Sequence, residues 1–392
     1  SVQNAEYCGD TVALRIVVDG GAAPSVLALV RSFRWLHGPL QTRLCDDEGV
    51  SLGIRGMWIQ TTHTDADDYH IVPLEDDIEV SPLYYWWLQR AQRSFGDFND
   101  AALMKQRRLA GISLYTPRLN EIKYPQVKWI PEENTRAVAF RLGVPCSWGA
   151  LFIGSVWKEF LEFYALRVRP PFFNFSQEAT QRGVGREREP LGDPHVRVPN
   201  SRSNVWPRSW KRFMIDFMYG RGMVMLYPNL PKQLSFSTTY MERGGHSGKD
   251  GKSEELQVTG LRKDVDPLKT VPLIRRQELR PVAQFFSNLP PYSELPVFNL
   301  QHEQRTSESL VQQGFAFTEH VRWWGHKLEA DTLQRGLKAK YAKLADSWSG
   351  LESRGPPGGC VPEQLAALQA DRRRGARAAD DGASPFVKGL GR

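Results

Sequence analysis

Apolar runs and turn-forming residues alternate along the first part of the chain in the manner of strand and helix units. Residues 11–19 are an apolar run closed by Asp-Gly-Gly, and residues 24–35 have helical spacing. A second apolar run at 71–74 is followed, after a Ser-Pro pair that suits a helix start, by an aromatic helical pattern from residue 83. This alternation predicts an α/β domain with a mixed, mostly parallel sheet flanked by helices.

The same alternation continues to about residue 250. Further strands are expected at 111–115, 137–142 and 222–227, and further helices at 98–110, 157–167 and 206–219. Residues 168–205 are rich in Pro, Arg, Gly and Asn and predict a long surface loop.

Beyond residue 250 the alternation of strand and helix patterns ends. We therefore predict that the chain has four parts. The α/β domain covers 1–250, an irregular charged connector covers 251–302, a helical extension covers 303–353, and a flexible basic tail covers 354–392.

Composition narrows the class of protein. The chain has 392 residues, of which 41% are hydrophobic, enough for a substantial core. Its net charge of +7 is spread along the sequence, so we expect no nucleic-acid partner, and no apolar stretch is long enough to span a membrane. The four cysteines lack zinc-site spacing; a disulfide between Cys8 and Cys45 and unpaired thiols both remain open. Asn174 begins a glycosylation sequon, usable in a secretory compartment.

Three consecutive acids, Glu75, Asp76 and Asp77, follow the apolar run at 71–74. Carboxylates this close repel one another unless they are solvated or neutralised, and Mg²⁺ and Mn²⁺ take oxygen ligands of this kind. In open α/β sheets ligands bind at the carboxyl ends of strands. We therefore predict Asp77 as a metal ligand, Asp76 as a ribose or second metal contact, and Glu75 as a nucleotide-facing group. The alternative is a solvated turn, like the acids at 65–68.

Two more positions could contact a nucleotide. Asp19 ends the first apolar run, where a base or ribose could lie, and Arg55 lies in a glycine-rich stretch suited to a phosphate. Asp-Gly is also a common turn dipeptide, so Asp19 has a purely structural alternative.

A candidate general base and a candidate metal ligand lie further along. Asp216 has Phe and Met neighbours that would raise its pKa, as a base requires, or it pairs with Arg212 or Arg221 within its helix. His246 follows two glycines and could bind Mn²⁺, although a lone loop histidine is more often solvent-exposed.

These segments resemble, in order, motifs of the N-acetylglucosaminyltransferase I family of GT-A-fold glycosyltransferases. Residues 74–82 resemble its Glu-Asp-Asp motif, 146–157 its Gly-Trp loop and following helix, 206–218 its Trp-Pro segment and Asp-containing helix, and 236–246 its histidine-ending loop. Residues 199–204 and 208–213 are also similar to glycosyltransferase-like proteins of plants, algae and protists. The family's base lies in a Trp-Asp-Asp-Trp segment, whereas here Trp210 is followed by Lys211 and Arg212.

The resemblance implies a GT-A-like domain that transfers a sugar from a UDP-sugar donor to a hydroxyl of a glycan or protein, with inversion. It implies Mn²⁺ or Mg²⁺ at Asp77 and His246, Asp216 as base, and work in the Golgi or another secretory lumen. Lys211, Arg212 and Arg202 are further candidates for phosphate or acceptor contacts. The rival interpretation is an inactive binding or scaffold subunit that engages a protein partner through its C-terminal region. A metal-dependent phosphohydrolase ranks last, because closely spaced Asp and His ligands for a second metal are lacking.

Overall fold

The computed structural model describes residues 1–45, 51–62, 69–123, 125–168, 197–206, 209–240 and 271–323. The chain divides into two compact units, Ser1–Glu319 and His320–Arg392, and the elements named below belong to the first. This unit extends well past the domain boundary expected at residue 250. Several sequence predictions lie outside the described residues: His246, the Asn174 sequon, the acids at 65–68 and the basic tail.

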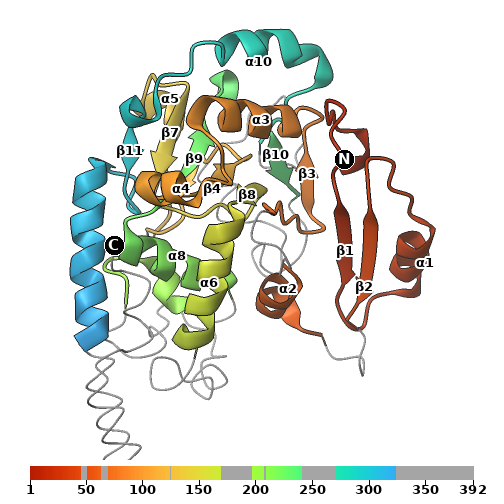
Figure 1. The fold of residues 1–392 in the computed structure, drawn as a ribbon, viewed down its shortest axis with the longest axis horizontal. Coiled ribbons are helices and arrows are strands. Elements are labelled where there is room, and N and C mark those ends of the chain that lie inside the picture. Colours follow the sequence, from red (N-terminus) through yellow and green to blue (C-terminus); the bar gives the residue numbers. More distant parts are fainter. Residues whose placement is uncertain are drawn as a thin grey trace, which may run out of the picture. The chain divides into compact units, whose positions relative to one another are not determined.

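A six-stranded mixed sheet forms the centre of the first unit (Figure 1). Its strands, in spatial order, are β12 (Gln304–Arg305), β11 (Val297–Phe298), β7 (Ala139–Leu142), β9 (Val224–Pro228), β4 (Leu109–Ser113) and β8 (Ala150–Phe152). Only β11 with β7 and β4 with β9 pair in parallel. The expectation of a mostly parallel sheet is therefore wrong for these strands, because an apolar run has the same pattern in either direction. The α/β class itself is confirmed.

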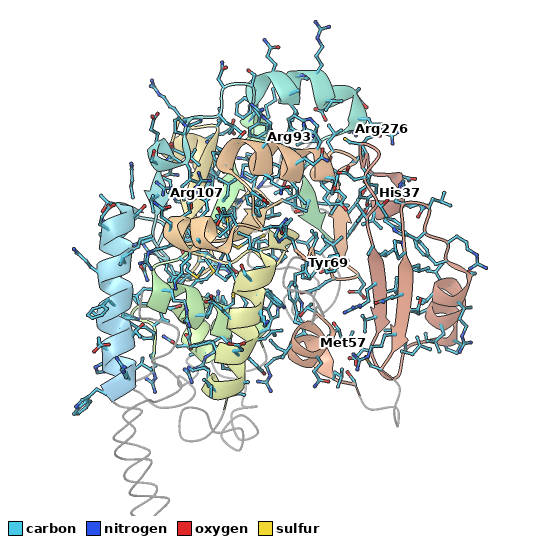
Figure 2. All side chains as sticks on the ribbon, viewed as in Figure 1. His37, Met57, Tyr69, Arg93, Arg107 and Arg276 are labelled. Carbon is cyan, nitrogen blue, oxygen red and sulfur yellow. The ribbon has the colours of Figure 1, made fainter. Side chains whose placement is uncertain are left out.

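Helices lie on both sides of these strands. In Figure 1, α3 (Tyr84–Phe95) and α10 (Leu279–Phe285) lie above the strands, and α6 (Gly154–Arg167) and α8 (Trp210–Arg221) lie below them. The helix α4 (Ala101–Arg107) leads into β4, and residues 307–319 form a helix that contacts the end of α8 through a Thr318 to Gly220 hydrogen bond. The side chains drawn in Figure 2 fill the interior, where Trp87, Trp157 and Trp210 are fully buried.

Smaller sheets complete the unit. The strand β1 (Leu14–Val18) and the helix α1 (Pro24–Ser32) confirm the first predicted strand and helix, and β2 (Leu40–Leu44) pairs in parallel with β1. The strand β3 (Ile78–Val80) pairs antiparallel with β10 (Ser237–Thr239), and β5 (Leu119–Asn120) pairs with β6 (Val127–Lys128). Two short helices, α2 (Gly53–Thr61) and α5 (Pro131–Asn134), are the remaining α-helical elements among the described residues.

The segment before the acid triplet differs from its prediction. Residues 71–74 are not a strand: Ile71 makes one isolated bridge to Phe152, and the strand β3 begins only after the acids. Pro73 explains the difference, because proline has no N–H to donate to a ladder. The triplet therefore lies at the beginning of a strand, not at the end of one.

Part of the expected connector is also ordered. Within 271–302, α10 packs beside α3, and β11 joins the central sheet next to β7. The sequence analysis did not predict β11, because a strand of two residues is too short to produce a periodic pattern.

The thiols of Cys8, Cys45 and Cys146 are free, so the Cys8–Cys45 disulfide is not formed. None of the helices within the described residues is long and apolar enough to cross a membrane.

Candidate functional site

The acid triplet lies on an ordered turn that β10 holds in place. Asp76 is exposed at the turn, and Asp77 is partly buried. The Thr239 hydroxyl donates to Oδ2 of Asp77 over 3.0 Å, and the backbone N–H of Tyr240 donates to the Asp77 carbonyl over 2.8 Å. The Asp77 carboxylate is thus fixed by the strand that leads along the chain towards His246.

Glu75 faces the interior side of the turn. The indole N–H of Trp58 donates to its Oε1 over 2.8 Å. Burial raises the pKa of the Glu75 carboxyl to about 7; the Trp58 hydrogen bond opposes this, and the charge of Asp77 adds to it. Lys211 is near enough that its charge also lowers this pKa. Glu75 therefore changes charge near neutral pH, unlike an ordinary surface glutamate.

A pair of stacked indoles connects the triplet to the start of α8. The rings of Trp58 and Trp210 lie 3.9 Å apart between centroids, at 16°. Phe152 packs edge-on against both rings. Because Trp210 is the first residue of α8, this stack places the N-terminal turn of that helix beside the acids. The two segments whose order resembled the glycosyltransferase family thus meet in space.

The residue after Trp210 is engaged in an ion pair. The Lys211 ammonium contacts Oε1 of Glu121, lies 3.4 Å from the Ser147 hydroxyl, and sits 5.6 Å from the ring centroid of Trp148. Its side chain is only 6% exposed, against 18% for Glu121. Sequence analysis identified Lys211 but missed Glu121, which lies in a loop with no motif around it.

Asp216 is a buried partner of Arg167. Its Oδ2 lies 3.1 Å from both Nε and Nη2 of Arg167, and its side chain is 2% exposed. Burial raises the pKa of this carboxyl, and the charges of Arg167 and Arg212 oppose the rise. A general base must reach its substrate, and this carboxylate does not reach solvent. The geometry is that of a structural ion pair whose hydrogen-bonded partner, Arg167, comes from α6, while the charge of Arg212 from the same helix also acts on Asp216.

Asp19 caps the loop before α2. Its carboxylate accepts from the backbone N–H groups of Leu52 and Gly53, at 2.7 and 3.1 Å, and from the Ser51 hydroxyl. Burial raises the pKa of Asp19, but these hydrogen bonds outweigh burial and hold it below its usual value. The backbone N–H of Gly20 also donates to this carboxylate over 2.9 Å, as in the turn-forming alternative. The donors of all these hydrogen bonds to the Asp19 carboxylate belong to the protein, so none requires a nucleotide.

Arg55 lies in the first turn of α2, so the glycine-rich stretch around it is helical. It belongs to a group of basic side chains: burial lowers the pKa of Arg212 to about 10, Asp216 opposes this, and the charges of Arg167, Arg197 and Arg55 lower it further. Arg167 and Arg212 are buried around Asp216, whereas Arg55 and Arg197 are partly exposed, where their charge can attract an anion.

The acid triplet offers only part of a metal-binding shell. Within the described ranges, no group of three or more His, Cys, Asp or Glu side chains could hold a metal ion. A cation of the Mg²⁺ type commonly takes only one or two protein carboxylates and completes its shell with water and substrate phosphates. Asp76 and Asp77 fit that arrangement, and His246 lies outside the described residues.

No protein-family model matches the chain, and no curated protein matches it either.

Proposed function

We propose that this chain is a metal-dependent glycosyltransferase that moves a sugar from a nucleotide-sugar, most simply a UDP-sugar, to a hydroxyl of a glycan or protein. The observation that carries the proposal is the ordered carboxylate turn beside the first turn of α8. Asp76 is exposed, Asp77 is held by Thr239, and the Trp58–Trp210 stack joins the turn to the helix. A GT-A-like arrangement of these elements belongs to the same proposal.

The roles of the residues follow from their chemistry. Asp77, with Asp76, would hold Mn²⁺ or Mg²⁺, which when bound would offset the charge that develops on the departing diphosphate. Arg55 and Arg197, which are partly exposed, would provide positive charge for the phosphates. Inverting transfer also needs a base at the acceptor hydroxyl, and Asp216 does not supply it from its buried position.

A second function is favoured by a specific observation. Lys211 and Arg212 occupy the place after Trp210 where the resembled family has two acids, and Lys211 is committed to Glu121. A protein with the donor site but without that carboxylate would bind a nucleotide-sugar and not transfer it. This is the binding or scaffold alternative, in which the C-terminal region engages a protein partner.

One assay separates the two functions. The protein is incubated with Mn²⁺ and a panel of UDP-sugars, with and without glycan acceptors; calorimetry measures binding, and UDP release measures turnover. Binding with turnover supports the transferase, and binding without turnover supports the scaffold. If no nucleotide-sugar binds, both proposals fail. A location in the Golgi or another secretory lumen depends on the transferase proposal and is tested by whether Asn174 carries a glycan in cells.

A further inference from the structure

The helix α1 presents apolar side chains to solvent. None of its residues is buried, and the helix lies at the right-hand edge of the view in Figure 1. Leu29 is 65% exposed, and Val26, one turn before it, is also exposed. Leu36, in the loop after the helix, is 79% exposed, the highest value for a large hydrophobic side chain among the described residues. Apolar side chains exposed together in this way indicate an interaction site.

Other side chains attach α1 and its loop to the rest of the unit. Leu27 and Val30 are half-buried, and they lie three residues apart, on one side of the helix. Phe33, directly after the helix, packs against the hydrophobic core. The Trp35 indole N–H donates to the Val12 carbonyl over 2.7 Å. Because these contacts hold the segment in place, the exposed leucines are not needed for its packing.

Positive charge accompanies the exposed leucines. Arg31 and Arg34 are exposed, and residues 20–45 contain no Asp or Glu. Nη1 of Arg34 donates to the carbonyls of Arg31, Ser32 and Phe33, which holds its guanidinium at the C-terminal end of α1. Among the described residues, the Arg31 guanidinium has no acidic partner. The end of α1 therefore carries two arginine charges beside apolar side chains.

The acids nearest in the sequence do not neutralise these arginines. The Asp10 carboxylate accepts from the Tyr85 hydroxyl and the Gln89 amide of α3, at 2.8 and 2.6 Å. The Asp19 carboxylate accepts from the loop before α2. The acids at 46–48 follow the last residue of β2, whereas residues 31–36 precede its first residue, and the structure does not describe 46–48.

We propose that α1 and the loop after it dock on a bilayer surface that contains anionic lipid. Leu29 and Leu36 insert among the headgroups, and Arg31 and Arg34 contact the lipid phosphates. Apolar side chains gain free energy by leaving water for the interfacial region of a bilayer, and arginines near anionic headgroups add electrostatic attraction. Because one such signal alone gives only weak, reversible binding, we expect both the leucines and the arginines to be required.

The size and exposure of this surface favour a bilayer over a protein partner. A specific protein interface buries roughly 800 Å² on each partner. The helix α1 has only nine residues, and Leu29 and Leu36 protrude from it and its loop, as insertion into a bilayer requires. A free anion would engage the arginines and leave the leucines in water. The proposal needs neither a metal nor a nucleotide-sugar, so it stands independently of the proposed function.

The test is flotation of the full chain with vesicles of phosphatidylcholine, alone or mixed with phosphatidylserine or phosphatidylglycerol. We expect binding to both anionic mixtures, weakened as KCl is added, and no binding to phosphatidylcholine alone. Leu29→Ser combined with Leu36→Ser should weaken binding at least tenfold, and so should Arg31→Glu alone. Because the replaced side chains are exposed, these variants should melt at the wild-type temperature.

Matched controls come from other exposed positions. Phe315→Ser removes an apolar side chain that is 66% exposed, and Arg280→Glu reverses an exposed charge on α10; both should bind as the wild type does. Replacement of the arginines at 372–374 by Gln removes the basic run of the tail, and the binding that is left should still require the two leucines. The proposal is overturned if no anionic vesicle is bound, if the double serine variant or the Arg31 variant binds as the wild type does, or if the tail replacement abolishes binding.

Discussion

Arg167 and Asp216 form an ion pair inside the protein, 3.1 Å apart, with side chains that are 3% and 2% exposed. The pair joins α6 to α8. Removing one partner leaves a buried charge without compensation. We expect Asp216→Asn and Arg167→Met each to lower the free energy of unfolding by about 3–5 kcal/mol in urea titrations.

The exposed Lys128–Glu133 pair provides the control for this prediction. The Lys128 Nζ and Glu133 Oε1 atoms lie 3.4 Å apart, and the two side chains are 47% and 61% exposed. Glu133→Gln should therefore lower the free energy of unfolding by less than about 1 kcal/mol. If Asp216→Asn were as stable as the wild type but had lost a transferase activity, Asp216 would be a catalytic group after all.

His302 should make stability depend on pH. Its pKa is about 3 in the folded protein, against an ordinary value of 6.5, so below pH 6.5 the unfolded chain binds the proton more strongly. The free energy of unfolding is therefore unaffected by His302 above pH 6.5. It falls progressively as the pH drops towards 3, by about 4–5 kcal/mol at most. His302→Gln should lack this component. Urea unfolding of both proteins between pH 7 and 4 measures it; a difference that does not vary with pH would refute the assignment.

Asp19 should stabilise α2 and contribute nothing to nucleotide binding. Asp19→Ala removes the acceptor for the N–H groups of Leu52 and Gly53, and we expect a loss of about 0.5–2 kcal/mol in the free energy of unfolding. Asp19→Asn keeps an acceptor oxygen and should lose less. A normal melting profile for Asp19→Ala combined with a weakened affinity for UDP would restore the sequence prediction that Asp19 contacts the ribose or base.

Local patterns predicted most of the longer helices, because their information lies within a few neighbouring residues, although α2 (Gly53–Thr61) was not predicted. The Ser-Pro pair before α3 is an example: the Ser81 hydroxyl accepts from the N–H of Leu83 over 3.1 Å. The apolar neighbours of Asp216 likewise indicated a buried carboxylate. Its partner did not follow, because Arg167 is 49 positions away and only the packing of α6 against α8 brings the two together.

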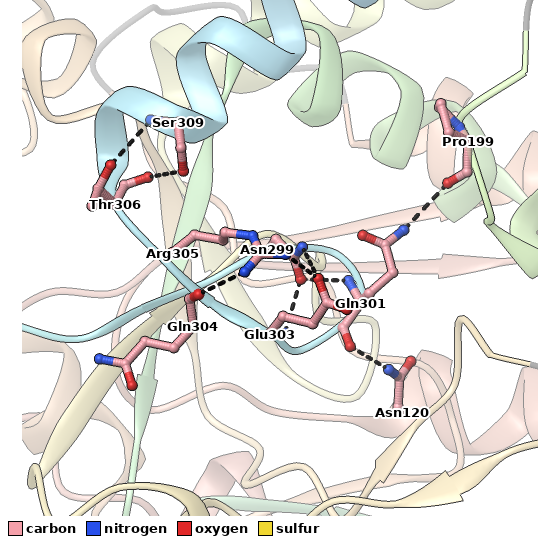
Figure 3. Close-up of polar contacts among 9 residues, drawn as sticks. All are labelled: Asn120, Pro199, Asn299, Gln301, Glu303, Gln304, Arg305, Thr306 and Ser309. Atoms are coloured by element: carbon pink, nitrogen blue, oxygen red, sulfur yellow. Dashed lines mark hydrogen bonds and ion pairs between the residues drawn. The ribbon is translucent and has the colours of Figure 1, made fainter.

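The remaining surprises have the same origin. Strand direction in the central sheet depends on chain connections that periodicity does not encode. The buried position of His302 depends on its left-handed backbone, in a loop that Asn299 and Asn120 fix (Figure 3), and Asn120 is 182 positions from His302. The acid triplet was predicted as a group, and the structure shows that its members differ: Glu75 is held by Trp58, Asp76 is exposed, and Asp77 is held by Thr239.

The most direct test of the central claim is calorimetric titration of UDP into the Mn²⁺-loaded protein and its Asp77→Asn variant. The amide keeps an oxygen to accept from Thr239 and removes the charge, so folding should be preserved. Asp97→Asn changes an exposed turn aspartate elsewhere and serves as the control. We expect Mn²⁺-dependent binding by the wild type and the control, and binding weakened at least tenfold in Asp77→Asn. Equal binding by Asp77→Asn, or no binding by the wild type, would contradict the proposal that Asp77 holds a nucleotide-binding metal.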